Sequence, residues 1–206
     1  MGIESDQRFQ VLHALRIKGF AKSDVLSELS GVHVEHVDAH LADLQGAELV
    51  LFREARALWQ LSPKGREHHG EQLAADVGRA GFREALHEHY ENFLALNDEF
   101  KALCGDWQLR DGIHNDHSDE AYDKGVVQRL IDLDLRTQPI VSAWGGQVLR
   151  FAPYAPRLGE ASVKVADGAN QLFTGVMCGS YHDIWMELHE DLILSLGIDR
   201  AAEGSF

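Results

Sequence analysis

The stretch from Ser30 to Phe52, SGVHVEHVDAHLADLQGAELVLF, contains an amphipathic helix followed by a short apolar run. Its apolar residues recur at intervals of three and four, which places them on one face of a helix. They are Val34, Val37, Leu41 and Leu44. The other face carries histidines and acids, and no lysine or arginine occurs between Lys22 and Arg53. The stretch therefore specifies a helix clearly and gives it an unusual charge.

Two further short helices are predicted before this stretch. The segment QRFQVLHALRIKGF, which begins at Gln7, has helical apolar spacing and stops at Gly19, a residue type that commonly ends helices. The segment AKSDVLSELSG follows, with Ser23 as the expected N-cap and Gly31 as the stop. With the segment from Val32 to Gly46, the sequence predicts three helices separated by tight turns.

After the third helix the apolar pattern changes. Two short apolar runs, Leu49 to Phe52 and Ala57 to Leu61, flank the residues REA, which predicts a small β-hairpin. Ser62 then precedes Pro63, a pairing that is typical of a helix start. The expected order is three helices, a hairpin and a fourth helix.

The second part of the chain predicts four more helices joined by short links, which favours an antiparallel bundle. They begin near Phe82, Ser118, Tyr154 and Ser180. Ser118 is a candidate cap for the second of these helices, and Pro139 is expected to kink or break it. Ser180 and Asp183 have the spacing of a capping box, and Gly197 is expected to end the last helix.

Composition limits the class of protein. A chain of 206 residues with 45% hydrophobic content can build a core without metal ions or disulfides. Its apolar runs are too short for the roughly 20 residues of a membrane span, and MGIESDQRFQ lacks the features of a secretory signal. Two cysteines, Cys104 and Cys178, are too few for a disulfide framework. We therefore expect a cytoplasmic protein without a membrane partner.

The net charge of −14 argues against a broad positive surface. Residues 1–75 hold 8 basic and 11 acidic side chains, and residues 76–206 hold 11 and 22. A DNA-binding protein gains much of its affinity by neutralising phosphates with lysine and arginine. The charge pattern leaves room only for a local basic patch in the first part of the chain.

The order of elements in residues 1–75, with GAELV before the hairpin and LSPKGREH after it, resembles the winged helix-turn-helix of MarR-like bacterial regulators. This resemblance implies a mainly α fold, with an N-terminal winged helix of three helices and a hairpin over residues 1–75. A helical bundle over residues 76–206 would dimerise or sense a small-molecule effector. It also implies a homodimer that binds double-stranded DNA, with the third helix in the major groove and the hairpin wing on the backbone.

On this interpretation, the third helix and its surroundings contact DNA. The candidate DNA-binding residues are Lys22, Ser23, His33, His36, His40, Arg53, Arg56 and Lys64. The three histidines share one helical face and can donate to phosphates or base edges, whereas the acids beside them repel the DNA backbone. The same histidines have the spacing of a metal clip, but the neighbouring acids point away, so no metal site and no cofactor are predicted.

A second resemblance suggests an alternative function. YENFLALNDEFK and SYHDIWMELHEDLILSLG are similar to a helical segment found with actinobacterial phosphoenolpyruvate-utilising enzymes of the pyruvate phosphate dikinase type. The threonine- and glycine-rich loop that carries the phosphorylated histidine of those enzymes is missing here. The alternative is therefore an accessory module whose winged helix binds protein instead of DNA, linked to such an enzyme.

Polar and aromatic residues of the second part form a candidate ligand site. If the loop RDGIHNDHSDEAY folds over the last helix, its histidines meet those of that helix. The candidate ligand-binding residues are His114, His117, Trp144, His182, Trp185 and His189. The alternative is that the histidines belong to the core and that the loop is a solvated connection. His68 and His69, next to each other after the hairpin, are expected at the surface.

Signatures of catalysis are scarce. The chain has no G-x-S-x-G elbow, no G-x-G-x-x-G, no P-loop and no C-x-x-C. Cys178 lies at the expected start of the last helix, where a lowered pKa would suit a sensor, but use as a small buried hydrophobe is commoner for cysteine. The sequence therefore predicts a transcriptional regulator and not an enzyme.

Overall fold

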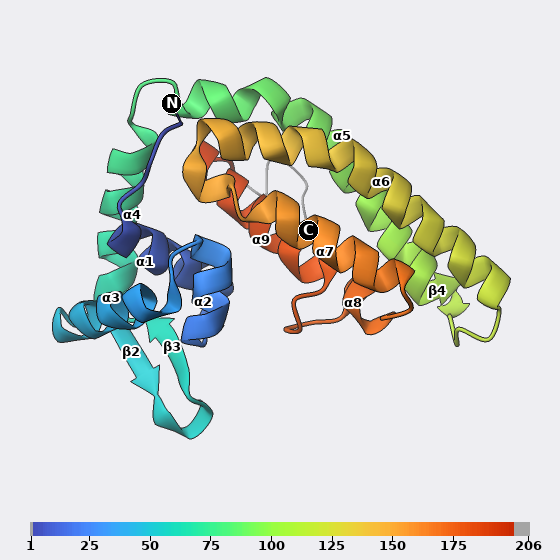
Figure 1. Ribbon diagram of the computed structural model, residues 1–206, viewed down its shortest axis with the longest axis horizontal. Helices are drawn as coiled ribbons and strands as arrows, with labels where there is room; N and C mark the ends of the chain where they lie inside the picture. Colours follow the sequence, from blue (N-terminus) through green and yellow to red (C-terminus); the bar gives the residue numbers. More distant parts are fainter. Residues whose placement is uncertain (1, 200–206) are drawn as a thin grey trace.

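A computed structural model describes residues 2–199 of the chain, which are mainly helical (Figure 1). The N-terminal unit consists of α1 (Gln7–Lys18), α2 (Ser23–Ser30), α3 (Val34–Gly46), α4 (Pro63–Val77) and a small sheet. The bundle consists of α5 (Phe82–Gln108), α6 (Glu120–Gln147), α7 (Tyr154–Ala166) and α9 (Tyr181–Leu196), with the short α8 (Gln171–Thr174). The predictions of a mainly α fold and of a helical bundle are confirmed.

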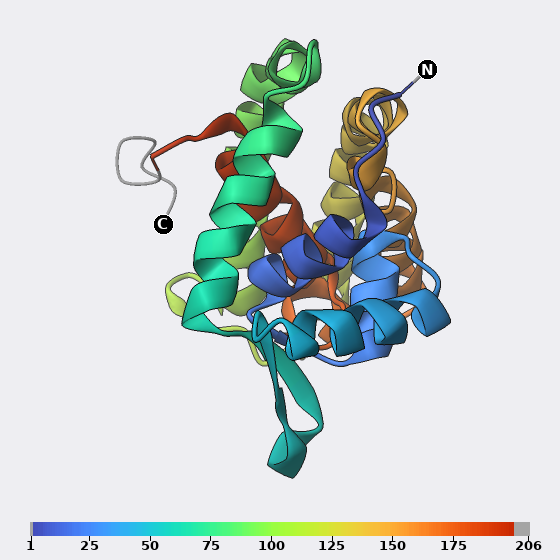
Figure 2. The same ribbon diagram turned by 90° about the vertical axis from the view of Figure 1, so that its left-hand side faces the viewer.

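The sheet of the N-terminal unit has three antiparallel strands in the order β1-β3-β2. The strands are β1 (Phe20–Ala21), β2 (Val50–Arg53) and β3 (Leu58–Leu61), and the turn between the last two is the 3₁₀ segment η1 (Glu54–Arg56). The predicted hairpin is therefore present, with Val50 opposite Leu61. The pairing of β1 with β3 was not predicted, because two residues are too short to show a period. The hairpin projects away from the helices (Figure 2).

Side-chain caps begin several helices, although two of the predicted caps are wrong. Ser62 accepts from the backbone N–H of Gly65 at 2.9 Å, and Ser180 caps α9 as predicted. Ser23 is not the cap of α2, because the helix already includes it and Lys22 is the N-cap residue. Ser118 is not the cap of α6, because Asp119 accepts from the first turn of that helix.

Pro139 does not break α6, which runs unbroken from Glu120 to Gln147. A proline removes the hydrogen bond to the carbonyl four residues earlier, here that of Leu135. Both Pro139 and Leu135 lie on the exposed side of the helix, where water can replace the missing donor. Of the kink or break that was predicted at Pro139, the break is therefore wrong, and the kink stays a prediction.

The longer helices form a layered bundle. α5 and α6 pack along each other, α7 packs on α6, and α9 contacts α1, α4, α5, α7 and α8. Two short strands, β4 (Leu109–Arg110) and β5 (Ile113–His114), pair at the end of α5. None of the helices within residues 2–199 is long and apolar enough to cross a membrane.

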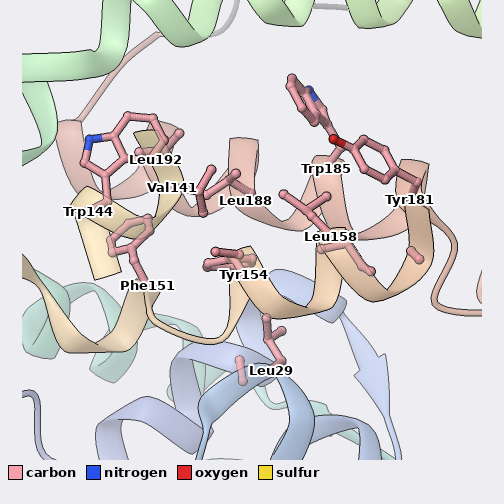
Figure 3. Packing of buried hydrophobic residues seen from close by; sticks show 14 of the residues in the cluster. Leu29, Val141, Trp144, Phe151, Tyr154, Leu158, Tyr181, Trp185, Leu188 and Leu192 are labelled. Atoms are coloured by element: carbon pink, nitrogen blue, oxygen red, sulfur yellow. The ribbon is translucent and has the colours of Figure 1, made fainter. Parts of the chain in front are cut away.

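One continuous cluster of buried apolar side chains joins the two parts. In the bundle, α9 contributes Tyr181, Trp185, Leu188 and Leu192, which lie beside residues of α6 and α7 (Figure 3). Leu29 of α2 extends toward Tyr154 from the N-terminal unit (Figure 3). The segment before α1 adds backbone bonds, because Ile3 donates to Gln147 at 2.7 Å and accepts from Leu149 at 2.9 Å. The N-terminal unit is thus packed on the bundle.

Gly65, in the first turn of α4, lies close against the backbone of Leu49, and its substitution tests this packing. A Cβ atom at this position would lie 1.9 Å from the carbonyl oxygen of Leu49. We expect Gly65→Ala to lower the free energy of unfolding by about 1–3 kcal/mol, because backbone would have to move. Urea unfolding followed by circular dichroism measures this change.

Gly70→Ala is the matched control, since nothing lies within 4 Å of a Cβ at that position of the same helix. Alanine favours helix over glycine, so we expect Gly70→Ala to be neutral or to stabilise by up to about 1 kcal/mol. Equal effects of the two substitutions would contradict the packing of α4 on Leu49.

Candidate functional site

The candidate DNA-binding histidines lie on the open side of α3. His33 and His36 are exposed and His40 is half-buried, whereas Val37, Leu41 and Leu44 are buried as predicted. Val34 was expected in the core but is 37% exposed. The acids of this helix, Glu35, Asp38 and Asp43, are also exposed. The solvent-facing surface of α3 therefore combines histidine with carboxylate.

The candidate cations lie around this helix, but they are not equally available. Arg53 and Arg56 are exposed at the turn of the hairpin, and Lys22 is exposed at the start of α2, beside the half-buried Ser23. Lys64 donates to the carbonyl of Ala47 at 2.9 Å and pairs with Glu48 at 3.3 Å. The side chain of Lys64 thus has partners within its own unit.

The structure separates the candidate ligand-binding residues. Trp144 is fully buried and donates to the carbonyl of Leu86 at 3.1 Å, so it belongs to the core. His114 is exposed on β5. His117 lies on Trp107, with ring centroids 4.5 Å apart, and its Nδ1 is 3.0 Å from Asp123. These contacts hold the loop between the end of α5 and the start of α6 and not over the last helix, in line with the alternative of a solvated connection.

The other three candidates do meet. His182, Trp185 and His189 of α9 line a pocket of about 350 Å³ together with residues of α5. The residues from α5 are Asn97, Phe100, Lys101, Cys104, Gly105 and Gln108. Trp185 donates to Asn97 at 2.9 Å, and this bond fixes one wall of the pocket.

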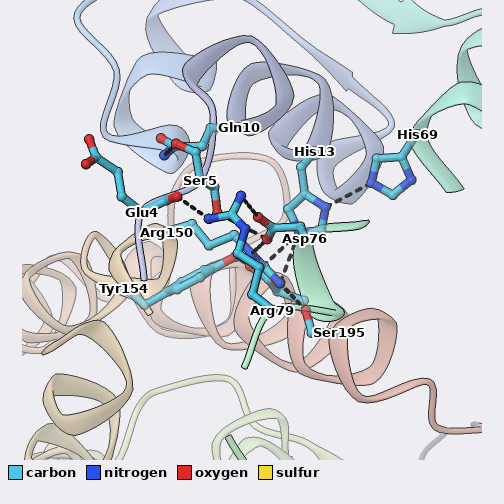
Figure 4. Close-up of polar contacts among 11 residues, drawn as sticks. Glu4, Ser5, Gln10, His13, His69, Asp76, Arg79, Arg150, Tyr154 and Ser195 are labelled. Carbon is cyan, nitrogen blue, oxygen red and sulfur yellow. Dashed lines mark hydrogen bonds and ion pairs between the residues drawn. The ribbon is translucent and has the colours of Figure 1, made fainter. Parts of the chain in front are cut away.

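A buried polar cluster between the N-terminal unit and the bundle was not predicted at all (Figure 4). At its centre is Arg150, which is 4% exposed and lies in the 3₁₀ segment η2 (Leu149–Phe151) between α6 and α7. Its guanidinium pairs with Asp191 of α9 and lies 3.2 Å from Asp76 of α4. It also lies over the rings of Phe82 and Phe151. One side chain thus links α4, α9 and the start of α5.

Asp191 has several donors besides Arg150. Tyr154 donates to its Oδ2 at 3.1 Å, and Ser195 donates to its Oδ1 at 3.0 Å. His13 Nε2 of α1 lies 2.9 Å from the same Oδ1. A buried carboxylate is costly unless charges and donors compensate it, and here they come from three different helices and a 3₁₀ segment.

His13 extends the cluster to His69 of α4, whose Nε2 lies 2.9 Å from Nδ1 of His13 (Figure 4). If Nε2 of His13 donates to Asp191, its Nδ1 accepts from His69. His69 is 3% exposed, so the expectation that it lies at the surface is wrong. The sequence gives no sign of this, because its partners are 56 and more residues away.

The pKa shifts follow from this burial. Burial lowers the pKa of His69 to about 3, and the nearby charges of His13, Arg16 and Arg150 act in the same direction. Burial also lowers the pKa of His13, although Asp191 opposes the shift. Burial alone would raise the pKa of Asp191, but Arg150 and His13 hold it below its usual value.

Ion pairs at the edge of the same interface add further links. Glu187 of α9 is 5% exposed and accepts from Lys18 of α1 at 2.6 Å and from Arg157 of α7 at 2.7 Å. Arg16 pairs with Glu190 at 3.2 Å. The contact between α1 and α9 is therefore largely charged, unlike the cores on either side of it.

No protein-family model matches the chain, and no curated protein and no solved structure is significantly similar to it. Within residues 2–199, no three histidine, cysteine or acidic side chains are gathered as they would be around a metal ion. The function of the chain must therefore be argued from its own surfaces and cavities.

The lowered pKa of His69 predicts a loss of stability in weak acid. His69 binds a proton near pH 6.5 in the unfolded chain but only near pH 3 in the folded chain. Protonation of His69 therefore favours unfolding as the pH falls below 6.5. Between about pH 7 and about pH 4.5 we expect the free energy of unfolding to fall by roughly 3 kcal/mol. Urea unfolding at a series of pH values measures this loss.

His69→Gln keeps a donor for His13 but cannot titrate, so it should reduce the pH-dependent loss by roughly 2 kcal/mol or more. His68→Gln is the matched control, because the half-buried His68 lies outside the cluster. The assignment is contradicted if the two variants have the same pH dependence as the unchanged protein.

Proposed function

We propose that the chain is a DNA-binding transcriptional regulator whose N-terminal unit is a winged helix. The observation that carries the proposal is the placement of α3 and the hairpin. α3 packs on α1, α2 and β2 and lies on the side of the N-terminal unit away from the bundle, and the hairpin projects from the end of the unit (Figure 1). These are the two elements with which winged helices contact the groove and the backbone of DNA.

The arrangement of the N-terminal unit supports this proposal. Its order is α1, β1, α2, α3, β2, β3 and α4, and β3 lies in the middle of the sheet. The exposed cations Arg53 and Arg56 are at the hairpin turn, and Lys22 precedes α2. These side chains would contact phosphates, while His33, the N-cap residue of α3, and His36 on the helix would face the base edges.

In this proposal the bundle dimerises or binds an effector, and the regulator works as a homodimer on two half-sites. A change in how the N-terminal units are held on their bundles would change the spacing of the two α3 helices and hence the fit to DNA. The polar cluster around Arg150 is the part of each protomer that sets this geometry.

A second candidate function follows from the acids on α3. Glu35, Asp38 and Asp43 are exposed among the histidines, and they would repel phosphates. The same surface suits a basic patch on another protein. The chain would then be an accessory, protein-binding module, as the similarity to segments beside phosphoenolpyruvate-utilising enzymes suggested.

The proposal predicts a salt-dependent complex with duplex DNA. At about 50 mM salt we expect the protein to bind a duplex from its own promoter region, and substitution of both Arg53 and Arg56 by Ala should weaken binding at least about tenfold and reduce the salt slope by about two. Fluorescence anisotropy of the labelled duplex at several salt concentrations measures both quantities.

The matched control replaces Lys124 and Arg129 by Ala, because these are exposed cations of α6 in the bundle. This variant has the same net charge as the hairpin variant and should bind DNA like the unchanged protein. If no complex forms at low salt, or if both double variants lose the same affinity, the DNA-binding proposal fails and the protein-binding module is favoured.

A further inference from the structure

The pocket between α5 and α9 has aromatic walls. Phe100 of α5 and Trp185 of α9 lie with their ring centroids 4.7 Å apart, and the ring of His182 is 6.2 Å from that of Phe100. The volume of about 350 Å³ lies at the lower end of the range of small-molecule sites. The pocket therefore suits a flat molecule of about one aromatic ring with a small substituent.

The charge of this pocket differs from that of the rest of the protein. In a chain of net charge −14, its described lining has Lys101, His182 and His189 and no carboxylate. A larger cleft of about 840 Å³ between the N-terminal unit and the bundle has five carboxylates and three cations in its lining. Of these two pockets, the smaller one therefore repels an electron-rich oxygen less.

His182 supplies a specific donor. Its Nδ1 is buried and has no hydrogen-bond partner among the described residues. An N–H left unpaired there would be costly, so the proton belongs on Nε2. A half-buried His182 on the pocket wall then offers an N–H to an acceptor atom of a ligand.

Cys104 does not make the pocket reactive. Burial raises the pKa of its thiol to about 12, and a protonated thiol is a poor nucleophile. The site is suited to reversible binding and not to covalent capture, and Cys104 acts there as a small apolar side chain.

We propose that this pocket binds a flat aromatic molecule with one acceptor oxygen, such as an aromatic carbonyl compound, which accepts a hydrogen bond from His182 Nε2. The aromatic ring lies against Phe100 and Trp185, and the oxygen lies at the end of the pocket formed by His182. As an effector site this rests on the proposed regulator, but binding itself does not require DNA.

Because the pocket lies on α9, ligand binding can act on the contacts between α9 and the N-terminal unit. One side of α9 faces the pocket with His182, Trp185 and His189. The opposite side carries three polar residues spaced four apart, which are Glu187, Asp191 and Ser195. The second set contacts α1 through Lys18 and His13, and it contacts Arg150. A rotation or shift of α9 on ligand binding would therefore change the contacts that hold the N-terminal unit.

The test compares two probes of the same shape, acetophenone and α-methylstyrene, which differ in that the carbonyl oxygen is replaced by a methylene group. Isothermal titration calorimetry of the full chain without DNA should show acetophenone binding about tenfold more tightly, the value of one hydrogen bond. In His182→Phe, the preference for acetophenone should disappear. His114→Phe, on the exposed β5 strand, should keep it.

A pocket-filling variant tests the location independently of His182. Gly105 lines the pocket, and a Cβ there would meet nothing within 4 Å. Gly105→Leu should fold, because leucine favours helix over glycine. Its affinity for both probes should fall by about tenfold or more. Gly125→Leu on α6, which is equally open at its Cβ, should bind like the unchanged protein.

The proposal is overturned if neither probe binds, if both bind with equal affinity, or if Gly105→Leu binds acetophenone as well as Gly125→Leu does. Each of these outcomes is independent of the DNA measurement. If the protein binds acetophenone but no DNA, the pocket proposal stands and the regulator proposal fails. If it binds DNA but not acetophenone, the regulator proposal stands and the pocket proposal fails.

Discussion

The fold depends on the pairing of Arg150 with two carboxylates that come from different parts of the chain. Asp76 lies in the last turn of α4 of the N-terminal unit, and Asp191 lies in α9 of the bundle. All three side chains are buried, so removing the guanidinium would leave two carboxylates that their remaining donors compensate only in part. Breaking a buried pair in this way typically costs about 3–5 kcal/mol. Because these pairs lie in the contact between the N-terminal unit and the bundle, they make the relative orientation of the two parts specific.

The helix α9 contacts both the bundle and the N-terminal unit, because other helices pack on most of its sides. One side lines an aromatic pocket with α5, and the other carries Glu187 and Asp191 to the cations and histidine of the N-terminal unit. Apolar burial holds the helix in the bundle, whereas charged contacts position the unit that the bundle carries. Such a division suits a protein in which a ligand signal must reach a surface formed by α3 and the hairpin.

The elements with a local signal were predictable, and the sites that depend on distant residues were not. The spacing of Val37, Leu41 and Leu44 indicated α3, and Ser62 with Pro63 indicated the start of α4. By contrast, His13 meets Asp191 across 178 positions of sequence, and no local pattern distinguishes a buried His69 from the half-buried His68 beside it. Three of the six candidate ligand-binding residues meet because they share α9. The predicted division into two domains at residue 75 falls inside α4, and the division itself stays a prediction.

The central claim is that the cluster around Arg150 holds the N-terminal unit on the bundle. Hydrogen exchange of the folded protein, measured for α1 and α6 in the unchanged chain and in Arg150→Met, tests it most directly, because opening of the contact exposes α1 without unfolding α6. The account predicts that protection of α1 falls at least about tenfold more than that of α6. Unchanged protection of α1, or an equal loss in both helices, would contradict it.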